Sequence, residues 1–149
     1  MVGDEQRPHE VTALLLGCVK EKLSVRAPAR ELYCSPLWRG RRAYAEASGR
    51  PWFILSARHG LVDPDELLDP YDFALPELSR AERRDWGERA IEGLENRLGA
   101  LTDAIFEVHA GGRYRTPIAA PLDRRGARIE APLAHISGVG CQIAWYDAH

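Results

Sequence analysis

Apolar residues along the chain gather in short continuous runs that alternate with segments of helical spacing. Three runs predict buried strands: residues 11–19 (VTALLLGCV), 52–56 (WFILS) and 103–110 (DAIFEVHA). A continuous apolar run bounded by turn residues is typical of a strand that is covered on both faces of a parallel sheet. Residues 127–133 (ARIEAPL) are expected to form a fourth strand or an extended segment.

The first helix is predicted after residue 35. Ser35 is a suitable N-cap, Pro36 suits the first helical position, and Gly49 marks the end. The inward face of this helix is expected to carry Leu37, Tyr44 and Ala45.

Three further helices follow from similar signals. Ser79 and Glu82 form a capping-box pattern, and apolar residues then repeat at helical spacing up to Leu98. A third helix is expected at residues 114–124, although two prolines leave its boundaries open, and a last one at residues 138–149.

This order of elements predicts an α/β fold. Strands that alternate with helices favour a single three-layer domain, in which a largely parallel sheet of about four strands is flanked by helices. The domain is expected to span residues 1–149, with residues 1–10 as a flexible lead-in. The loop at residues 57–78 is unusually long, and such loops are more often functional than idle.

Composition narrows the class of protein. The chain has 149 residues, 45% of them hydrophobic and 28% charged, and a net charge of −2, so any site for a polyanion must be local. Three widely spaced cysteines argue against a disulfide framework or a zinc site, and favour a reducing, cytoplasmic location. The apolar runs are too short to span a bilayer, so no membrane partner is expected. No cofactor is expected, and whether the acidic loop binds a metal stays open.

The two lysines of the chain lie close together. Eighteen of the twenty basic residues are arginine, yet Lys20 and Lys22 both follow the first strand. An amine differs from a guanidinium because its pKa can fall far enough for it to act as a nucleophile, and it also serves as a compact charge for a phosphate. We interpret Lys20 as the functional lysine and Lys22 as an incidental surface residue.

Three polar, glycine-containing loops follow the three predicted strands: residues 17–22 (GCVKEK), 56–66 (SARHGLVDPDE) and 109–115 (HAGGRYR). In a parallel sheet the carboxyl ends of the strands meet at one edge, where ligands bind. The sequence therefore predicts a site at this edge.

Each loop offers candidate chemistry. Carboxylates of the second loop are able to activate a water, although an acid beside a proline often only starts a turn. Gly111 and Gly112 suit an anion, because their N–H groups precede a helix. The candidate catalytic residues are Lys20, His59, Asp63, Asp65 and Asp72. The candidate substrate-binding residues are Cys18, Ser35, Ser56, Arg58, Tyr71, His109, Gly111, Gly112 and Tyr114.

Several quoted stretches resemble known families. Nearly the whole chain, including LLLGCVKEKL, PWFILSARHGLVDPDELLDPYDFAL and VHAGGRY, resembles a small bacterial and phage family, and the second stretch is similar to a segment of the YaaA peroxide-stress proteins. The YaaA resemblance implies a lysine after the first strand, here Lys20, and a nucleic-acid partner. The helical DNA-binding insertion of larger YaaA proteins has no counterpart in this chain. A more distant likeness to archaeosine synthase implies a lysine that reacts with a deazaguanine base in transfer RNA.

These signals lead to one hypothesis and two alternatives. The hypothesis is an enzyme that acts on a nucleobase in a nucleotide or nucleic acid and hydrolyses the N-glycosidic bond. Lys20 would attack the sugar or hold the phosphate, and Tyr71 or Tyr114 would contact the base. The alternatives are lysine-dependent modification or transfer of the base, and a non-catalytic binder of modified or damaged nucleic acid. The base, the sugar and the choice between free nucleotide, DNA and RNA stay open.

Overall fold

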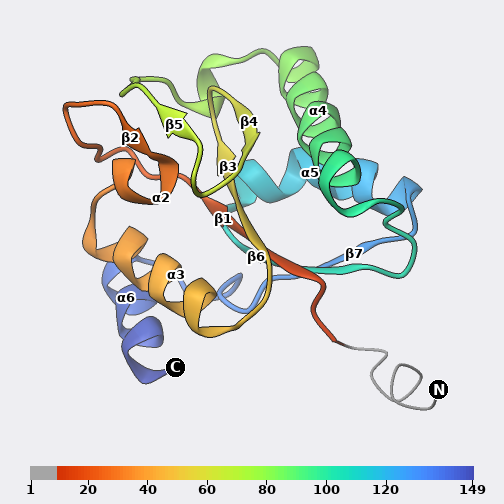
Figure 1. Cartoon of the computed structure of the whole chain (residues 1–149). Coiled ribbons are helices and arrows are strands. Elements are labelled where there is room, and N and C mark those ends of the chain that lie inside the picture. The colour runs from red at the N-terminus through yellow and green to blue at the C-terminus, as the bar shows by residue number, and fades with distance from the viewer. Residues whose placement is uncertain (1–9) are drawn as a thin grey trace.

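Five strands form the central sheet of the computed structural model, which describes residues 10–149 (Figure 1). Their order across the sheet is β4-β3-β1-β6-β7. The strands are β1 (Ala13–Gly17), β3 (Trp52–Ser56), β4 (Gly60–Val62), β6 (Ile105–His109) and β7 (Arg128–Glu130). Four of them are parallel and β4 runs antiparallel to β3. The predicted α/β class with a largely parallel sheet is confirmed.

The register brings the carboxyl ends of three strands to one edge. Leu16 in β1 lies opposite Ile54 in β3 and His109 in β6. The segments that follow these strands therefore leave the sheet side by side, as the loop pattern predicts.

Two helices cover one face of the sheet. These are α4 (Arg80–Leu98) and α5 (Gly112–Arg124), which lie together in Figure 1. Their buried side chains pack against Leu15 and Phe106 of the sheet. We call this layer, with the sheet face beneath it, the apolar face.

Three helices and a small sheet cover the opposite face. The helices are α2 (Ala29–Leu32), α3 (Pro36–Ala47) and α6 (Val139–Ala148), and α6 packs against α3 (Figure 1). The small sheet pairs β2 (Ala27–Pro28) with β5 (Leu67–Leu68). Leu14, Leu16 and Ile54 of the sheet pack here. We call this layer the polar face, because it also contains buried polar groups.

The predicted helices are largely confirmed. Ser35 caps α3 by accepting a hydrogen bond of 3.0 Å from the Trp38 amide, and Ser79 and Glu82 form the predicted capping box of α4. The predicted inward face of α3 is confirmed for Ala45, which is buried, and for Tyr44, which is partly buried and packs against the core cluster of this layer, but Leu37 is not part of that cluster. Trp38 and Arg41 fill the remaining buried positions. Helix α5 begins two residues before the predicted residue 114.

The expected loop at residues 57–78 contains regular structure, so its interpretation as one long loop is wrong. It includes β4, β5 and the short helix η1 (Leu75–Glu77). Gly60, with φ of +78°, closes the tight turn between β3 and β4. Strands of two or three residues are too short to show a periodic pattern, which is why the sequence did not indicate them. The lead-in expected at residues 1–10 lies outside the described residues, apart from Glu10.

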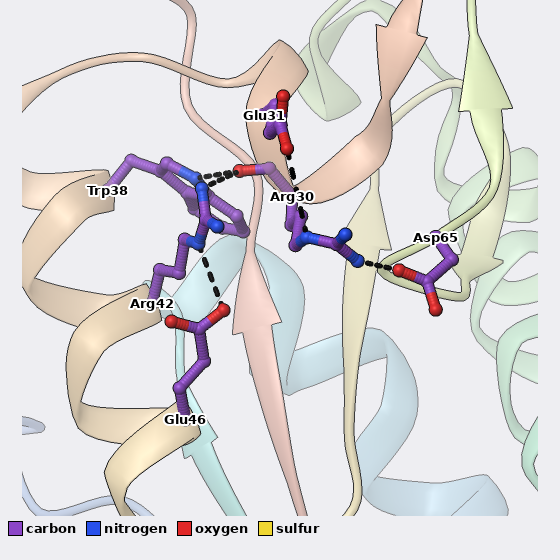
Figure 2. Close-up of polar contacts among 6 residues, drawn as sticks. All are labelled: Arg30, Glu31, Trp38, Arg42, Glu46 and Asp65. Atoms are coloured by element: carbon purple, nitrogen blue, oxygen red, sulfur yellow. Dashed lines mark hydrogen bonds and ion pairs between the residues drawn. The ribbon is translucent and has the colours of Figure 1, made fainter.

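Polar contacts around Arg30 connect the layers of the polar face (Figure 2). The Arg30 carbonyl accepts hydrogen bonds from the Trp38 indole at 3.0 Å and from Arg42 at 3.2 Å. The Arg30 guanidinium forms ion pairs with Glu31 and Asp65. These contacts tie α2 to α3 and to the turn before β5.

No helix within residues 10–149 is long and apolar enough to cross a membrane.

Candidate functional site

A group of side chains at the carboxyl ends of β1 and β3 forms the first part of the site. We call it the tyrosine cluster, and it consists of Cys18, Lys22, Tyr33, Ser56, Tyr71 and Tyr114. The hydroxyl of Tyr71 lies 2.6 Å from that of Tyr33 and 2.8 Å from Ser56 Oγ. Ser56 is fully buried and also accepts a hydrogen bond from the His59 amide at 3.1 Å. A continuous chain of hydroxyl groups therefore runs from Ser56 at the end of β3 through Tyr71 to Tyr33.

Cys18 connects this chain of hydroxyl groups to α5. It follows β1 directly, and its Sγ lies 3.3 Å from the Tyr114 hydroxyl and 3.5 Å from the Ala57 amide nitrogen. The thiol is partly buried. It is thus fixed at the centre of the edge by groups from the other two loops.

Lys22 lies against the tyrosine rings. Its Nζ is 4.3 Å from the centroid of the Tyr71 ring and 5.7 Å from that of Tyr33, and it donates a 3.1 Å hydrogen bond to the Lys20 carbonyl. Partial burial lowers the pKa of the Lys22 ammonium, while nearby Cys18 and Asp72 oppose this shift. The Lys20 side chain is exposed. The geometry thus favours Lys22, and not Lys20, as the amine at this edge.

The tyrosine hydroxyls are held in their neutral form. Burial raises the pKa of Tyr33 to about 12, and it also raises the pKa values of Tyr71 and Tyr114. Neutral phenols both donate and accept hydrogen bonds. The cluster therefore offers hydroxyl donors next to a partly buried amine.

A small cavity lies at the end of β6, and we call it the arginine cavity. Its volume is about 220 Å³, and its lining includes Arg41, His109, Gly111, Arg115, Gln142 and Tyr146. His109 Nε2 lies 2.7 Å from Glu107 Oε2, and Nδ1 lies 2.7 Å from the Tyr146 hydroxyl. Although burial opposes it, hydrogen bonds from His109 and Tyr44 lower the pKa of the Glu107 carboxyl.

Both arginines of this cavity bind main-chain carbonyls. Arg41 is 8% exposed and donates from Nη1 to the Gly17 carbonyl at 2.8 Å. Arg115 donates from Nε to the Ala110 carbonyl at 3.1 Å. Since Gly17 precedes Cys18, the cavity and the tyrosine cluster are neighbours along one sheet edge.

The structure brings together part of the predicted site. Cys18, Ser56, Tyr71 and Tyr114 are members of the tyrosine cluster, and the His59 ring meets Tyr71 edge-on at 5.3 Å. His109 and Gly111 line the arginine cavity, and Gly112 begins α5 beside it.

The remaining predicted site residues are not members of the tyrosine cluster or the lining of the arginine cavity. Asp63 accepts hydrogen bonds of 2.8 and 3.2 Å from Arg97, and Asp65 pairs with Arg30. Ser35 caps α3. Lys20, Arg58 and Asp72 are exposed, although Asp72 lies near enough to Lys22 to affect its pKa.

Sequence reasoning did not place Tyr33, Arg41, Glu107 or Tyr146 at the site. Arg41 had a usable signal, because it lies three residues after Trp38 and four before Ala45, and residues at that spacing share a helix face. Glu107 also had a signal, because it lies two residues before the predicted His109 and alternate residues of a strand share a face. Tyr33 and Tyr146 had none, since their contacts join segments far apart in the chain. Within residues 10–149, no group of three or more histidine, cysteine or acidic side chains is arranged to hold a metal ion.

The comparisons with known proteins establish the family. A model described as a family of unknown function, DUF6884, matches residues 13–148, so the chain belongs to that family. It is also similar to the protein named "Uncharacterized protein YfjM" of Bacillus subtilis (strain 168), with 28% identity over 122 residues, which cover 77% of this chain and 75% of YfjM. No solved structure matches the chain. Neither match names the YaaA proteins, so that resemblance stays a prediction.

Proposed function

We propose that this protein is an enzyme that acts on a nucleobase in a nucleotide or nucleic acid and hydrolyses its N-glycosidic bond. The observation that carries the proposal is the position of Lys22. Its amine is partly withdrawn from water, has a lowered pKa, and lies over the Tyr71 ring beside the end of β1. A desolvated lysine of this kind is a good nucleophile because more of it is neutral at a given pH.

The chemistry assigned to Lys22 is attack on the sugar carbon that bears the base. The neutral amine forms a bond to this carbon, the bond to the base nitrogen breaks, and the departing base takes up the proton that the amine loses. The ring oxygen then leaves the same carbon and takes up the remaining proton of the nitrogen, so that a hydroxyl group and an imine with Lys22 form. Water hydrolyses the imine, which restores the amine and releases the sugar.

Neighbouring groups have roles in this scheme. The Tyr71 and Tyr114 hydroxyls are neutral donors for a leaving base or a sugar oxygen. Of the predicted carboxylates, Asp72 is the one whose charge acts on the pKa of Lys22. The resemblance to the YaaA proteins also supports a lysine after the first strand, and the position of Lys22 against the tyrosine rings supports this lysine instead of Lys20.

Release of free base is the direct test. Ordinary and modified nucleosides, nucleotides and short DNA or RNA would be incubated with the protein, and free base measured by liquid chromatography and mass spectrometry. We expect release from at least one substrate, lost in Lys22→Gln and kept in the matched control Lys20→Gln. Release that depends on Lys20 and not on Lys22 would refute the assigned nucleophile, and absence of release from every substrate would refute the hydrolysis.

A second candidate function is transfer or modification of the base itself. It is favoured by the shared position of Cys18 and Lys22, two nucleophilic side chains, and by the likeness to archaeosine synthase, which implies a lysine that reacts with a base. Borohydride reduction distinguishes the two, because it traps an imine between Lys22 and a sugar. A base-containing adduct on Cys18 or Lys22 would favour transfer, and salt-dependent binding with no product would favour the non-catalytic binder.

A further inference from the structure

We propose that the arginine cavity binds a phosphate monoester, and that this group is the terminal phosphate of the substrate. The binding itself is argued from the cavity alone. The second part, that the phosphate belongs to the substrate, rests on the proposed function.

Positive charge in the cavity is not balanced by acidic side chains. Within residues 10–149, Arg41 hydrogen-bonds to the Gly17 carbonyl and to the Tyr146 side chain, and Arg115 hydrogen-bonds to the Ala110 carbonyl. Neither arginine forms an ion pair with a carboxylate of these residues. Glu107, an acid in contact with the lining residue His109, has its carboxylate hydrogen-bonded to that histidine. Cations withdrawn from water without a counter-ion are costly, so a bound anion would stabilise this arrangement.

Arg41 also has an unused donor. Its side chain is more than nine-tenths buried, and in the described part of the chain its Nε is the buried side-chain polar atom without a hydrogen-bond partner. Buried donors in native proteins are almost always paired, and an unpaired one calls for a ligand or water. Since Arg41 lines the cavity, an anion there is the acceptor that fits.

The start of α5 provides an independent second feature. Gly111 is its N-cap, lines the cavity, and supplies no side chain to cap the first-turn N–H groups. A Cβ placed on Gly111 would meet no atom within 4 Å, so the space beside it is open. Free N–H groups at the start of a helix of 13 residues favour a negatively charged group.

These features fit a phosphate monoester better than an internal phosphodiester. Two guanidinium groups and a helix N-terminus match the two negative charges of a monoester, whereas a diester has one charge. The Tyr146 hydroxyl and the Gln142 amide add neutral partners around the same small volume. A cavity of about 220 Å³ suits a terminal group and leaves little room for a chain that continues on both sides.

The cavity is correctly placed for a substrate that reaches Lys22. Arg41 holds the carbonyl immediately before Cys18, and Tyr114, which contacts Cys18, is in the first turn of α5. A phosphate at the start of α5 and a sugar at the tyrosine cluster would therefore occupy adjacent parts of one sheet edge.

Calorimetric titration with inorganic phosphate at constant ionic strength tests the cavity. We expect binding to the unmodified protein and a roughly ten- to hundredfold loss of affinity in Arg115→Gln, as charge-assisted hydrogen bonds are lost. Arg113→Gln is the matched control, because Arg113 is exposed in the same helical turn and does not line the cavity. Absence of phosphate binding, or equal affinity in both variants, would overturn the proposal. Arg41→Gln, checked for folding by circular dichroism, should lose affinity as well.

Nucleoside 5′-monophosphates and the corresponding nucleosides extend the test to the substrate. In Lys22→Gln, which lacks the proposed nucleophile, we expect monophosphates to displace inorganic phosphate and nucleosides not to. Phosphate binding without base release by the unmodified protein would refute the hydrolysis and support the cavity. Base release that is unaffected in Arg115→Gln would refute the role of the cavity in substrate binding.

Discussion

The two faces of the central sheet differ in what they bury. On the apolar face, α4 and α5 cover a continuous cluster of hydrophobic side chains that includes Trp86, Ile91 and Leu94. The three buried polar or charged side chains among residues 10–149 are Arg41, Ser56 and His109, and all belong to the polar face or its edge. One sheet thus separates two tasks: the apolar face contributes mainly stability, and the polar face, together with the start of α5, positions the candidate site.

Close packing of the apolar face explains this division. A Cβ added to Gly87 in α4 would lie 2.1 Å from the Pro117 carbonyl oxygen in α5, so the two helices pack at a distance that only glycine permits. At this crossing the two helices leave no space for a ligand between them. On the polar face, by contrast, the arginine cavity and the partly exposed tyrosine cluster leave room for one.

The largest expected effect is on the apolar face. Leu94→Ala should lower the free energy of unfolding by about 2–5 kcal/mol, because the Leu94 side chain is fully buried and its loss leaves a cavity beneath α4. Urea unfolding measures this loss. The matched control is Leu67→Ala, since Leu67 is 56% exposed and the same change should cost little there. Similar losses in both variants would contradict the role given to the apolar face.

Alkaline pH should weaken the polar face next. The folded pKa of Tyr33 is about 12, above its unfolded value of 10, so the unfolded chain loses this proton first. The contribution of Tyr33 to stability is therefore complete below about pH 10 and declines as the pH rises to about 12. At pH 11, about 1 kcal/mol of this contribution is lost. Urea unfolding at several pH values, with Tyr33→Phe for comparison, measures this share. If the free energy of unfolding fell equally steeply with pH in Tyr33→Phe, Tyr33 would not be the source of the decline.

A smaller effect is expected from one hydroxyl of the tyrosine cluster. Tyr71→Phe removes the group that joins Tyr33 to Ser56, and should cost about 0.5–1.5 kcal/mol, the usual net value of a hydrogen bond. Ser56 still accepts from the His59 amide, which limits the loss. Unfolding measurements check the value, and a loss as large as that of Leu94→Ala would mean that this face also carries the main stability.

The smallest expected effect is a difference in titration between the two lysines of the site. Reductive methylation followed over pH by peptide mass spectrometry should give Lys22 a midpoint below the ordinary lysine value of about 10.4. Lys20 is exposed and lies two residues away, so its methylation is the control that the reagent reaches this segment. A Lys22 midpoint at or above the ordinary value would remove the basis for its role as nucleophile.

Much of the fold could be predicted because its signals are local. The run before Gly17, the cap at Ser35 and the capping box at Ser79 each act over a few residues, and each led to an element that the structure contains. The short strands β4 and β5 could not be predicted, because their pairing depends on neighbours and not on their own pattern.

The sequence by itself determined the α/β class, the parallel strands and the edge at which their loops meet, since apolar periodicity and end signals are sufficient for these. Only the tertiary structure decided which lysine faces the tyrosine rings, that Asp63 and Asp65 pair with arginines, and that Arg41 donates to the Gly17 carbonyl. The physical reason is distance along the chain. Tyr33 and Tyr71 are 38 residues apart and Cys18 and Tyr114 are 96 apart, so their contacts arise only when the layers pack.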